Sequence, residues 1–484
     1  MSVKCGALMD LADAYVKAYD RMTPCAGARC DRMRPDALRV AERVQSAVER
    51  SGGMALPANW LSGPAPSVKL FGVLLGLHQV LLDADRERDD LSTQRRKVLR
   101  GRLTRTGRLN TKSTKGALVY ARTMCGRPDR VRYQLDEFLP VLRRIPENEW
   151  KLMQVRHAKA VLDLDASRAK DIPETEPTAP LLIAQLPFLA DKDDLDWGPE
   201  GEDRYRVAPR TDRLRGHIKA ALAELDDSKA HLGILPEASL NDDLLAIWRD
   251  VMVNGRRPSG SRLTWILVGT GPVKSVGPPP CVPDIPPNRA VLLHRRTGRE
   301  LLAQDKQFGF TLDADRQQEY DLRDPSRCDL GGVTRGEWIA EGEKLNILES
   351  HSGRYAILIC EDVGRLLKTG HTLAVAGVSH VLVPVLAAAM HKKGWSGRAA
   401  EELARDAGAA VAVSNGLAIH RYIPAQHCAN NPYCPAPTLL AATPARTRPI
   451  QSYVSYAPKE IGLPEDLAVV DSRVDALTPR CFLM

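Results

Sequence analysis

Three residues of the kinds that together cleave amides each follow a short apolar run. Glu237, Lys306 and Cys360 lie far apart in the chain, and each comes at the end of a segment typical of a buried strand. A cysteine can act as a nucleophile, a glutamate as a general base, and a lysine as the partner of an oxyanion. Amide hydrolysis requires all three roles at once, so the set predicts a cysteine amidase.

Each residue also has an ordinary structural explanation. Free cysteines are among the most buried residues, so Cys360 alone indicates only a core position. Glu237 precedes a predicted helix over Ala238–Met252, whose dipole an acid at its start would offset. Lys306 follows Asp305 and reads as a surface lysine. Only the combination favours chemistry.

The elements that must position these residues alternate between strands and helices after residue 180, which predicts an α/β domain with a mostly buried sheet. The predicted strands are Leu181–Leu186, Leu232–Leu235, Leu263–Val268, Ala290–His294, Tyr355–Ile359, Val381–Val385 and Ala410–Val413. The predicted helices are Arg213–Leu225, Leu244–Met252 and Arg398–Ala407. Two irregular stretches, 272–287 and 313–335, are long enough to cover a site.

Residues 181–475 resemble the nitrilase, or carbon–nitrogen hydrolase, superfamily. The resemblance lies in an ordered set of motifs: Leu235–Glu237, Asn288–Lys306, Gly353–Asp362, Ala376–Pro384 and Ala409–Asn415. It implies an α+β or α/β fold, a four-layer αββα sandwich, with Glu237 as general base, Lys306 as oxyanion partner and Cys360 as nucleophile. It also implies dimerisation, or a higher homo-oligomer, through the sandwich.

The same family uses a second glutamate before the cysteine strand. Glu337 is the best match, and Glu341 and Glu343 are the alternatives.

The resemblance ends directly after the cysteine. The family has an arginine–aromatic–proline–glutamate run there, whereas this chain has Val363-Gly364-Arg365-Leu366-Leu367. Substrate choice therefore does not carry over. Glu361, Arg365 and Trp395 are the candidates for contact with the substrate.

The first 170 residues are predicted to form an all-helical domain, because apolar residues recur there at helical spacing. The pattern covers Leu8–Tyr19, Leu38–Val48 (after a start at Pro35-Asp36), Val68–Leu82, Val131–Leu142 and Trp150–Leu164. A basic segment, Arg95–Lys115, lies between these helices and suits either a nucleic acid or acidic protein, or a solvated face. The acidic, proline-rich stretch 171–180 is predicted to be a linker to a nitrilase-like domain at 181–484.

Composition agrees with two soluble domains. The chain has 484 residues, 44% of them hydrophobic, and a formal net charge of +8. We expect no signal peptide, no membrane span and reduced cysteines in the cytoplasm. The spacing of the ten cysteines predicts no metal site, and no cofactor is expected.

The leading prediction is hydrolysis of a non-peptide carbon–nitrogen bond in a small amide or nitrile, through a thioester. Within the same chemistry, the chain could be an amide acyltransferase, or a glutaminase that feeds a partner synthetase. A different alternative is an interaction or regulatory module that binds nucleic acid or an acidic partner through Arg95–Lys115.

Overall fold

The computed structural model describes most of the region after residue 180 and part of the region before it. The described residues are 8–22, 28–51, 55–85, 117–120, 142–145, 153–157, 181–189, 191–280, 282–320, 322–323, 330–350, 353–365, 372–373, 376–387, 395–416, 418–419, 439–442 and 468–471. The predicted linker 171–180 and the basic segment 95–115 lie outside them, so their roles stay predictions.

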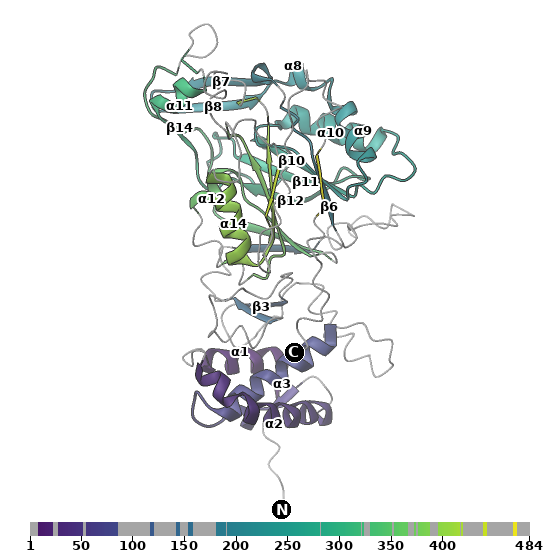
Figure 1. Ribbon diagram of the computed structural model, residues 1–484, viewed down its shortest axis with the longest axis vertical. Helices are drawn as coiled ribbons and strands as arrows, with labels where there is room; N and C mark the ends of the chain where they lie inside the picture. Colours follow the sequence, from purple (N-terminus) through teal and green to yellow (C-terminus); the bar gives the residue numbers. More distant parts are fainter. Residues whose placement is uncertain are drawn as a thin grey trace, which may run out of the picture.

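Two six-stranded sheets form the centre of the molecule (Figure 1). The first has the strand order β12-β11-β10-β9-β6-β20, and the second β19-β18-β17-β16-β15-β5. The strands of the first are β6 Leu182–Gln185, β9 Leu232–Ile234, β10 Trp265–Pro272, β11 Asn288–His294, β12 Glu300–Asp305 and β20 Ala468–Asp471. Those of the second are β5 Met153–His157, β15 Leu345–Glu349, β16 Arg354–Ile357, β17 His380–Val385, β18 Ala410–Asn415 and β19 Leu439–Ala442.

The sheets pack face to face and helices cover both outer faces, so the predicted four-layer αββα sandwich is confirmed. On β10, Trp265 and Leu267 point into the core shared by the two sheets. Ile266 and Val268 point the other way, as alternation in a strand requires, into the core under α9 (Ile218–Asp227) and α10 (Asp242–Asn254). Across the sandwich, α14 (Trp395–Ala407) and the short α12 (Glu361–Arg365) lie on the outer side of the second sheet (Figure 1).

A third, four-stranded sheet stands at one end of the sandwich and was not predicted. Its order is β13-β14-β8-β7. Its strands are β7 Leu195–Glu200, β8 Arg204–Pro209, β13 Thr311–Leu312 and β14 Arg335–Glu337. The hairpin β7–β8 pairs in parallel with β14 through β8. No element was predicted over 195–209, where β7 and β8 form, and the stretch 313–335, predicted to be irregular, contains α11 (Ala314–Glu319) and ends at the first residue of β14.

Most predicted elements after residue 180 form within a few residues of the expected bounds. The predicted helix Arg213–Leu225 is divided into two helices, α8 (Thr211–Leu214) and α9. Arg215, Gly216 and His217 form a turn between them. Gly216 is a poor helix former, which is one local reason for the break.

Three helices precede the sandwich: α1 (Leu11–Met22), α2 (Ala28–Arg50) and α3 (Val68–Asp85). Short elements β1 Leu8–Asp10, β2 Ala55–Pro57 and the 3-10 helix η1 Ala58–Leu61 accompany them. The prediction that α2 begins at Pro35 is wrong, because the helix starts seven residues earlier and takes the proline into its interior. Gly72 and Gly76 let α3 approach α2 closely: a Cβ on Gly72 would lie 2.4 Å from the Cβ of Val40.

The region before residue 170 is not all helical. Strands β3 (Ala117–Tyr120) and β4 (Leu142–Ile145) pair with each other, and β5 pairs in parallel with β15 of the second sheet. The helix predicted over Trp150–Leu164 is therefore wrong for Met153–His157. The alternation there is too short to be noticed in sequence, and the strand is fixed by its pairing with β15, a contact remote in the chain.

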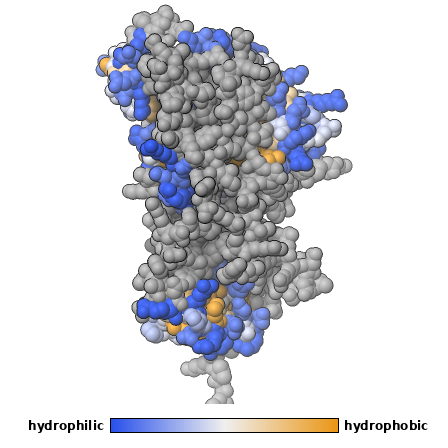
Figure 2. Space-filling model, viewed as in Figure 1, coloured by the Kyte–Doolittle hydropathy of each residue, from blue (hydrophilic) through white to orange (hydrophobic). Residues whose placement is uncertain are grey.

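The described surface is mostly hydrophilic on the face shown in Figure 2. The exposed large apolar side chains, Leu38, Val253, Val282 and Val333, come from separate segments. Among the described helices, none is both long and apolar enough to cross a membrane.

Candidate active site

Glu237 lies in the turn between β9 and α10, at the end of the first sheet. The turn is pressed against β10, where a bulge between Val268 and Thr270 brings Gly269 beneath it. A Cβ on Gly269 would lie 1.8 Å from the Pro236 carbonyl oxygen, so only glycine fits there. The carboxylate is 3% exposed and belongs to this turn rather than to the first turn of α10, which Asn241 caps.

Lys306 follows β12 directly, and its ammonium joins the two glutamates. Its backbone N–H donates to the Asn288 carbonyl (2.8 Å) at the end of the neighbouring strand. Its Nζ donates to Glu237 Oε1 (2.8 Å) and to Glu337 Oε2 (2.7 Å). Burial works to lower the pKa of Lys306, but the two carboxylates raise it well above its usual value. The ammonium is therefore permanently charged.

Glu337 is the second glutamate of the cluster. It ends β14, and its Oε2 also accepts from the Phe310 amide (3.0 Å). The alternatives predicted from sequence lie elsewhere: Glu341 is exposed and accepts from the Gly309 amide (2.9 Å), and Glu343 is exposed.

Asn288 is a member of the cluster that the sequence analysis did not single out. Its Nδ2 donates to Glu237 (3.0 Å) and to Glu337 (2.8 Å), so it bridges the same two carboxylates as Lys306. It begins the apolar run of β11, and a polar residue at the end of a buried strand is the signal that could have identified it. Glu237 Oε2 accepts a further hydrogen bond from the Leu386 amide (3.0 Å), which fixes that carboxylate.

Cys360 occupies a sharp turn between the second sheet and α12. Its φ of +47° is rare for a residue with a side chain and marks local backbone strain. Its N–H donates to the Pro384 carbonyl (3.0 Å), which ties the turn to β17. The residue is 5% exposed, and its thiol lies close enough to Glu237 for that carboxylate to raise the pKa of the thiol. The nucleophile and base expected from sequence therefore lie in the same buried cluster.

Burial is the largest influence on the protonation of Cys360 and Glu237. Burial, and then the Glu237 charge, raise the pKa of the Cys360 thiol well above its usual value, although Lys306 works to lower it. Lys306 therefore does not keep a thiolate populated in the resting site. Burial and the Glu337 charge also raise the pKa of Glu237, against the lowering effect of Lys306. A thiol beside a base of raised pKa needs that base to become reactive.

Asp362 connects the cysteine turn to the lysine loop. Its Oδ1 accepts from the amides of Gln307 and Phe308 (both 3.0 Å), and its Oδ2 from the amide of Ile359 (3.0 Å). Burial raises the pKa of Asp362 to about 7, against the effect of these amides and Lys306. This carboxyl group holds the segments on either side of the site in register with each other.

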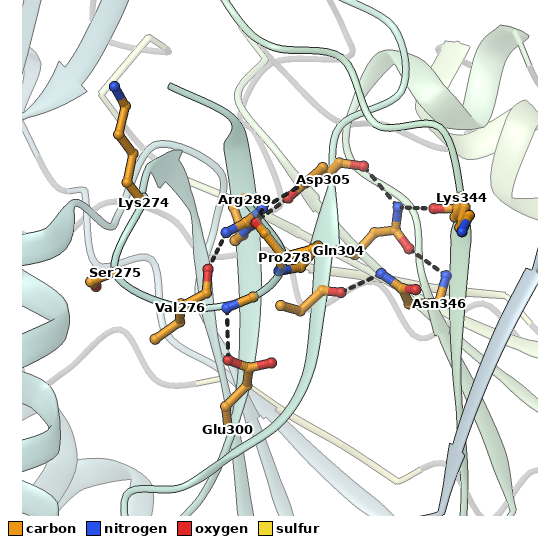
Figure 3. Close-up of polar contacts among 12 residues, drawn as sticks. Lys274, Ser275, Val276, Pro278, Arg289, Glu300, Gln304, Asp305, Lys344 and Asn346 are labelled. Carbon is orange, nitrogen blue, oxygen red and sulfur yellow. Dashed lines mark hydrogen bonds and ion pairs between the residues drawn. The ribbon is translucent and has the colours of Figure 1, made fainter. Parts of the chain in front are cut away.

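A second polar network supports Asn288 and Lys306 from behind (Figure 3). Arg289 is fully buried and pairs with Asp305, with 2.8 Å between Nη2 and Oδ2. It also donates to the carbonyls of Val276 and Pro278, which anchors the loop 272–287. Arg289 directly follows Asn288, and Asp305 directly precedes Lys306. The ion pair therefore fixes the start of β11 and the end of β12 next to each other.

Gln304 extends this support to the second sheet. Its Nε2 donates to the Lys344 carbonyl (2.9 Å), and its Oε1 accepts from the Asn346 amide (2.8 Å) at the start of β15 (Figure 3). The site therefore sits where both sheets are cross-linked.

A cavity of about 160 Å³ reaches the cluster from the side of the third sheet. Asn288 and Glu337 form its inner wall. The rest of its lining is mostly apolar: Arg206, Val207, Ala208, Pro272, Pro286, Trp338 and Ile339. Such a volume holds a group about the size of a benzene ring.

Among the residues predicted to contact the substrate, Glu361 and Arg365 are not brought into the cluster by any described side-chain contact, and the side chain of Trp395 lies outside the described part of the structure. Glu361 and Arg365 pair with each other (2.9 Å) on α12, where the arginine side chain is half exposed. Trp395 is the first residue of α14. Among the described residues, no group of three or more His, Cys, Asp or Glu side chains could hold a metal ion.

The chain matches no protein-family model and no curated protein. Solved structures that resemble it include an amidase from Nesterenkonia sp., with 16% identity, 60% of this chain and 89% of that chain covered, and a TM-score of 0.34. A mutant of that amidase in complex with butyramide is 17% identical, with 60% and 90% covered and a TM-score of 0.35. At these values the likeness says nothing about the chemistry of this chain.

Proposed function

We propose that this chain hydrolyses the carbon–nitrogen bond of a small amide through a thioester on Cys360. The observation that supports the proposal is the burial of three reactive groups together: Glu237 bonds to Lys306 at 2.8 Å, and the charges of both act on the buried Cys360 thiol. Buried ionisable groups with raised pKa values at the end of a sheet are typical of catalytic sites.

In the first half of the reaction, Glu237 takes the thiol proton and the sulfur attacks the substrate carbonyl carbon. The electron pair of the C=O bond moves to oxygen, where the Lys306 ammonium stabilises the negative charge. The backbone N–H of Glu361 also donates to this oxyanion. Glu361 is the first residue of α12, and helix geometry leaves its N–H without an intrahelical partner. Collapse re-forms the C=O bond and breaks the C–N bond, and protonated Glu237 gives its proton to the departing nitrogen.

In the second half, water cleaves the thioester. Glu237 takes a proton from water, the hydroxide adds to the thioester carbon, and collapse releases the acid while the sulfur regains a proton from Glu237. Glu337 and Asn288 act as positioning groups in both halves, because they hold Lys306 and Glu237 in place. The cavity beside them favours a short, largely apolar acyl or amine group.

The test is ammonia release from a panel of short-chain primary amides by the full chain. Cys360→Ser should lower the rate by roughly a thousandfold or more while leaving the fold intact. Cys30→Ser, which changes the other buried free cysteine among the described residues, should leave it unchanged. Mass spectrometry of acid-quenched reactions should find the acyl group on the peptide that contains Cys360.

Parental turnover by Cys360→Ser would overturn the proposal. Added hydroxylamine separates hydrolysis from acyl transfer: an amidase loses a minor share of product to hydroxamate, whereas an acyltransferase makes hydroxamate its main product.

A further inference from the structure

Tyr205 lies directly beside Glu337 although it is remote from the cluster in sequence. Strands β8 and β14 run parallel, and Tyr205 is the register partner of Glu337. The Trp338 amide donates to the Tyr205 carbonyl (2.8 Å), which continues the ladder. Neighbouring strands lie about 4.8 Å apart, and partners in a ladder project to the same face. The phenol ring therefore stands next to the Glu337 side chain.

The ring of Tyr205 is held firmly. It stacks on Trp197 of β7, with 5.9 Å between centroids and 24° between planes, and it packs with Leu312 and Ile419. The residue is only 2% exposed. A stacked and buried ring keeps its hydroxyl at one place, as a group that recognises a ligand must.

The hydroxyl of Tyr205 has no hydrogen-bond partner within the part of the chain that the structure describes. Buried tyrosine hydroxyls normally have one. Burial and the nearby Glu337 charge raise the pKa of Tyr205 well above its usual value, and Lys306, Glu237 and Cys360 also act on it. The group is therefore a neutral O–H donor close to the reacting groups.

The hydroxyl is not among the fully enclosed unpartnered polar atoms of the described residues, so solvent or a ligand can reach it and supply the acceptor. The two carboxylates of the cluster already accept from Lys306, Asn288 and a backbone amide each. The cavity runs along the same strand, from Arg206 to Ala208, and reaches Glu337. Tyr205 does not itself line the cavity, but Val207, two residues further along β8 and on the same face of the strand, does.

We propose that the Tyr205 hydroxyl donates a hydrogen bond to the carbonyl oxygen of the substrate, and so stabilises the oxyanion together with Lys306. This inference rests on the proposed function, since it assigns a residue to that reaction. The proton stays on Tyr205 throughout, so the tyrosine contributes a hydrogen bond and no proton transfer.

The test compares two reagents that modify Cys360. Chloroacetamide carries an amide carbonyl, whereas methyl methanethiosulfonate reacts with thiols and carries none. Tyr205→Phe keeps the ring on Trp197 and removes only the hydroxyl. It should slow labelling of Cys360 by chloroacetamide at least about tenfold and change labelling by the thiosulfonate less than twofold. Loss of one oxyanion donor should lower kcat on the best amide by roughly 100- to 1,000-fold.

The matched control is Tyr320→Phe, which makes the same change in the same apolar cluster and should alter neither labelling rate. Equal slowing with both reagents in Tyr205→Phe would identify a merely structural residue and overturn the inference. Parental labelling rates with both reagents in Tyr205→Phe would overturn the inference and leave the proposed function standing. Failure of both reagents to label Cys360 in the parent would overturn it together with the proposed function.

Discussion

Replacing Glu337 with glutamine should make Glu237 a stronger acid. Bonds of 2.8 and 2.7 Å to the same Lys306 nitrogen hold the two carboxylates within about 5.5 Å of each other. At that separation, two like charges in a site of effective dielectric constant about 20 repel by roughly 3 kcal/mol. Glu337 is one of the groups that raise the pKa of Glu237, after burial itself. Removing its charge should therefore favour the anionic form of the base.

The assay is the pH dependence of Cys360 alkylation, followed by peptide mass spectrometry, because it needs no substrate. Only anionic Glu237 can accept the thiol proton, so the alkylation rate falls at acid pH as Glu237 becomes protonated. About 3 kcal/mol corresponds to roughly two pH units, so the acid limb of the Glu337→Gln profile should move to lower pH by about that much.

Glu341→Gln is the matched control. Glu341 lies four residues further along the same segment and bonds only to the Gly309 amide among the described contacts, so its profile should coincide with that of the parent. An acid limb that stays in place in Glu337→Gln would refute the reasoning, since the two carboxylates would then not be coupled. Equal shifts in both variants would refute it as well, because they would reflect the general field of the protein.

Three further perturbations test the supports of the site and the fold. Asp362→Asn leaves one of three backbone amides without its acceptor and should lower the free energy of unfolding by about 2 kcal/mol in urea titrations; an unchanged urea midpoint would contradict this. Burial lowers the pKa of His380 to about 4, so the unfolded chain alone binds this proton between about pH 6.5 and 4. Stability should therefore fall by about 3 kcal/mol as the pH is lowered across that window, and His380→Phe should flatten the dependence measured by urea titration. Gly72→Ala places a methyl group against Val40 and should destabilise the helices by about 1–3 kcal/mol in thermal melts, whereas Gly364→Ala, whose Cβ meets nothing within 4 Å, should not.

The sandwich and most of the cluster could be predicted because the signals are local. Buried strands are continuous apolar runs, and a reactive residue directly after such a run must lie at a sheet end. Glu237, Lys306 and Cys360 all follow that rule. Their convergence then depends on strand order alone, because β9 and β12 belong to one sheet and β16 to the sheet packed on it.

Glu337 and Tyr205 show where such reasoning ends. No local pattern separates Glu337 from Glu341 or Glu343. What selects it is the parallel pairing of β14 with β8, a contact between residues more than a hundred positions apart. Tyr205 is brought to the site by the same pairing. The substrate role of Arg365 stays a prediction: its charge pairs with Glu361 one helical turn away, and only coordinates show which of several nearby acids a long side chain meets.

The charge balance of the cluster explains how a buried site of this kind can react. Two carboxylates and one ammonium leave an excess negative charge away from water, and burial raises the pKa of both Cys360 and Glu237. Moving the thiol proton to Glu237 creates a thiolate and removes a carboxylate charge, so the total buried charge does not change. Burial therefore does not oppose the step, although it opposes loss of that proton to solvent. Lys306 attracts either anion, and Glu337 keeps the ammonium in place at 2.7 Å while the negative charge passes from oxygen to sulfur.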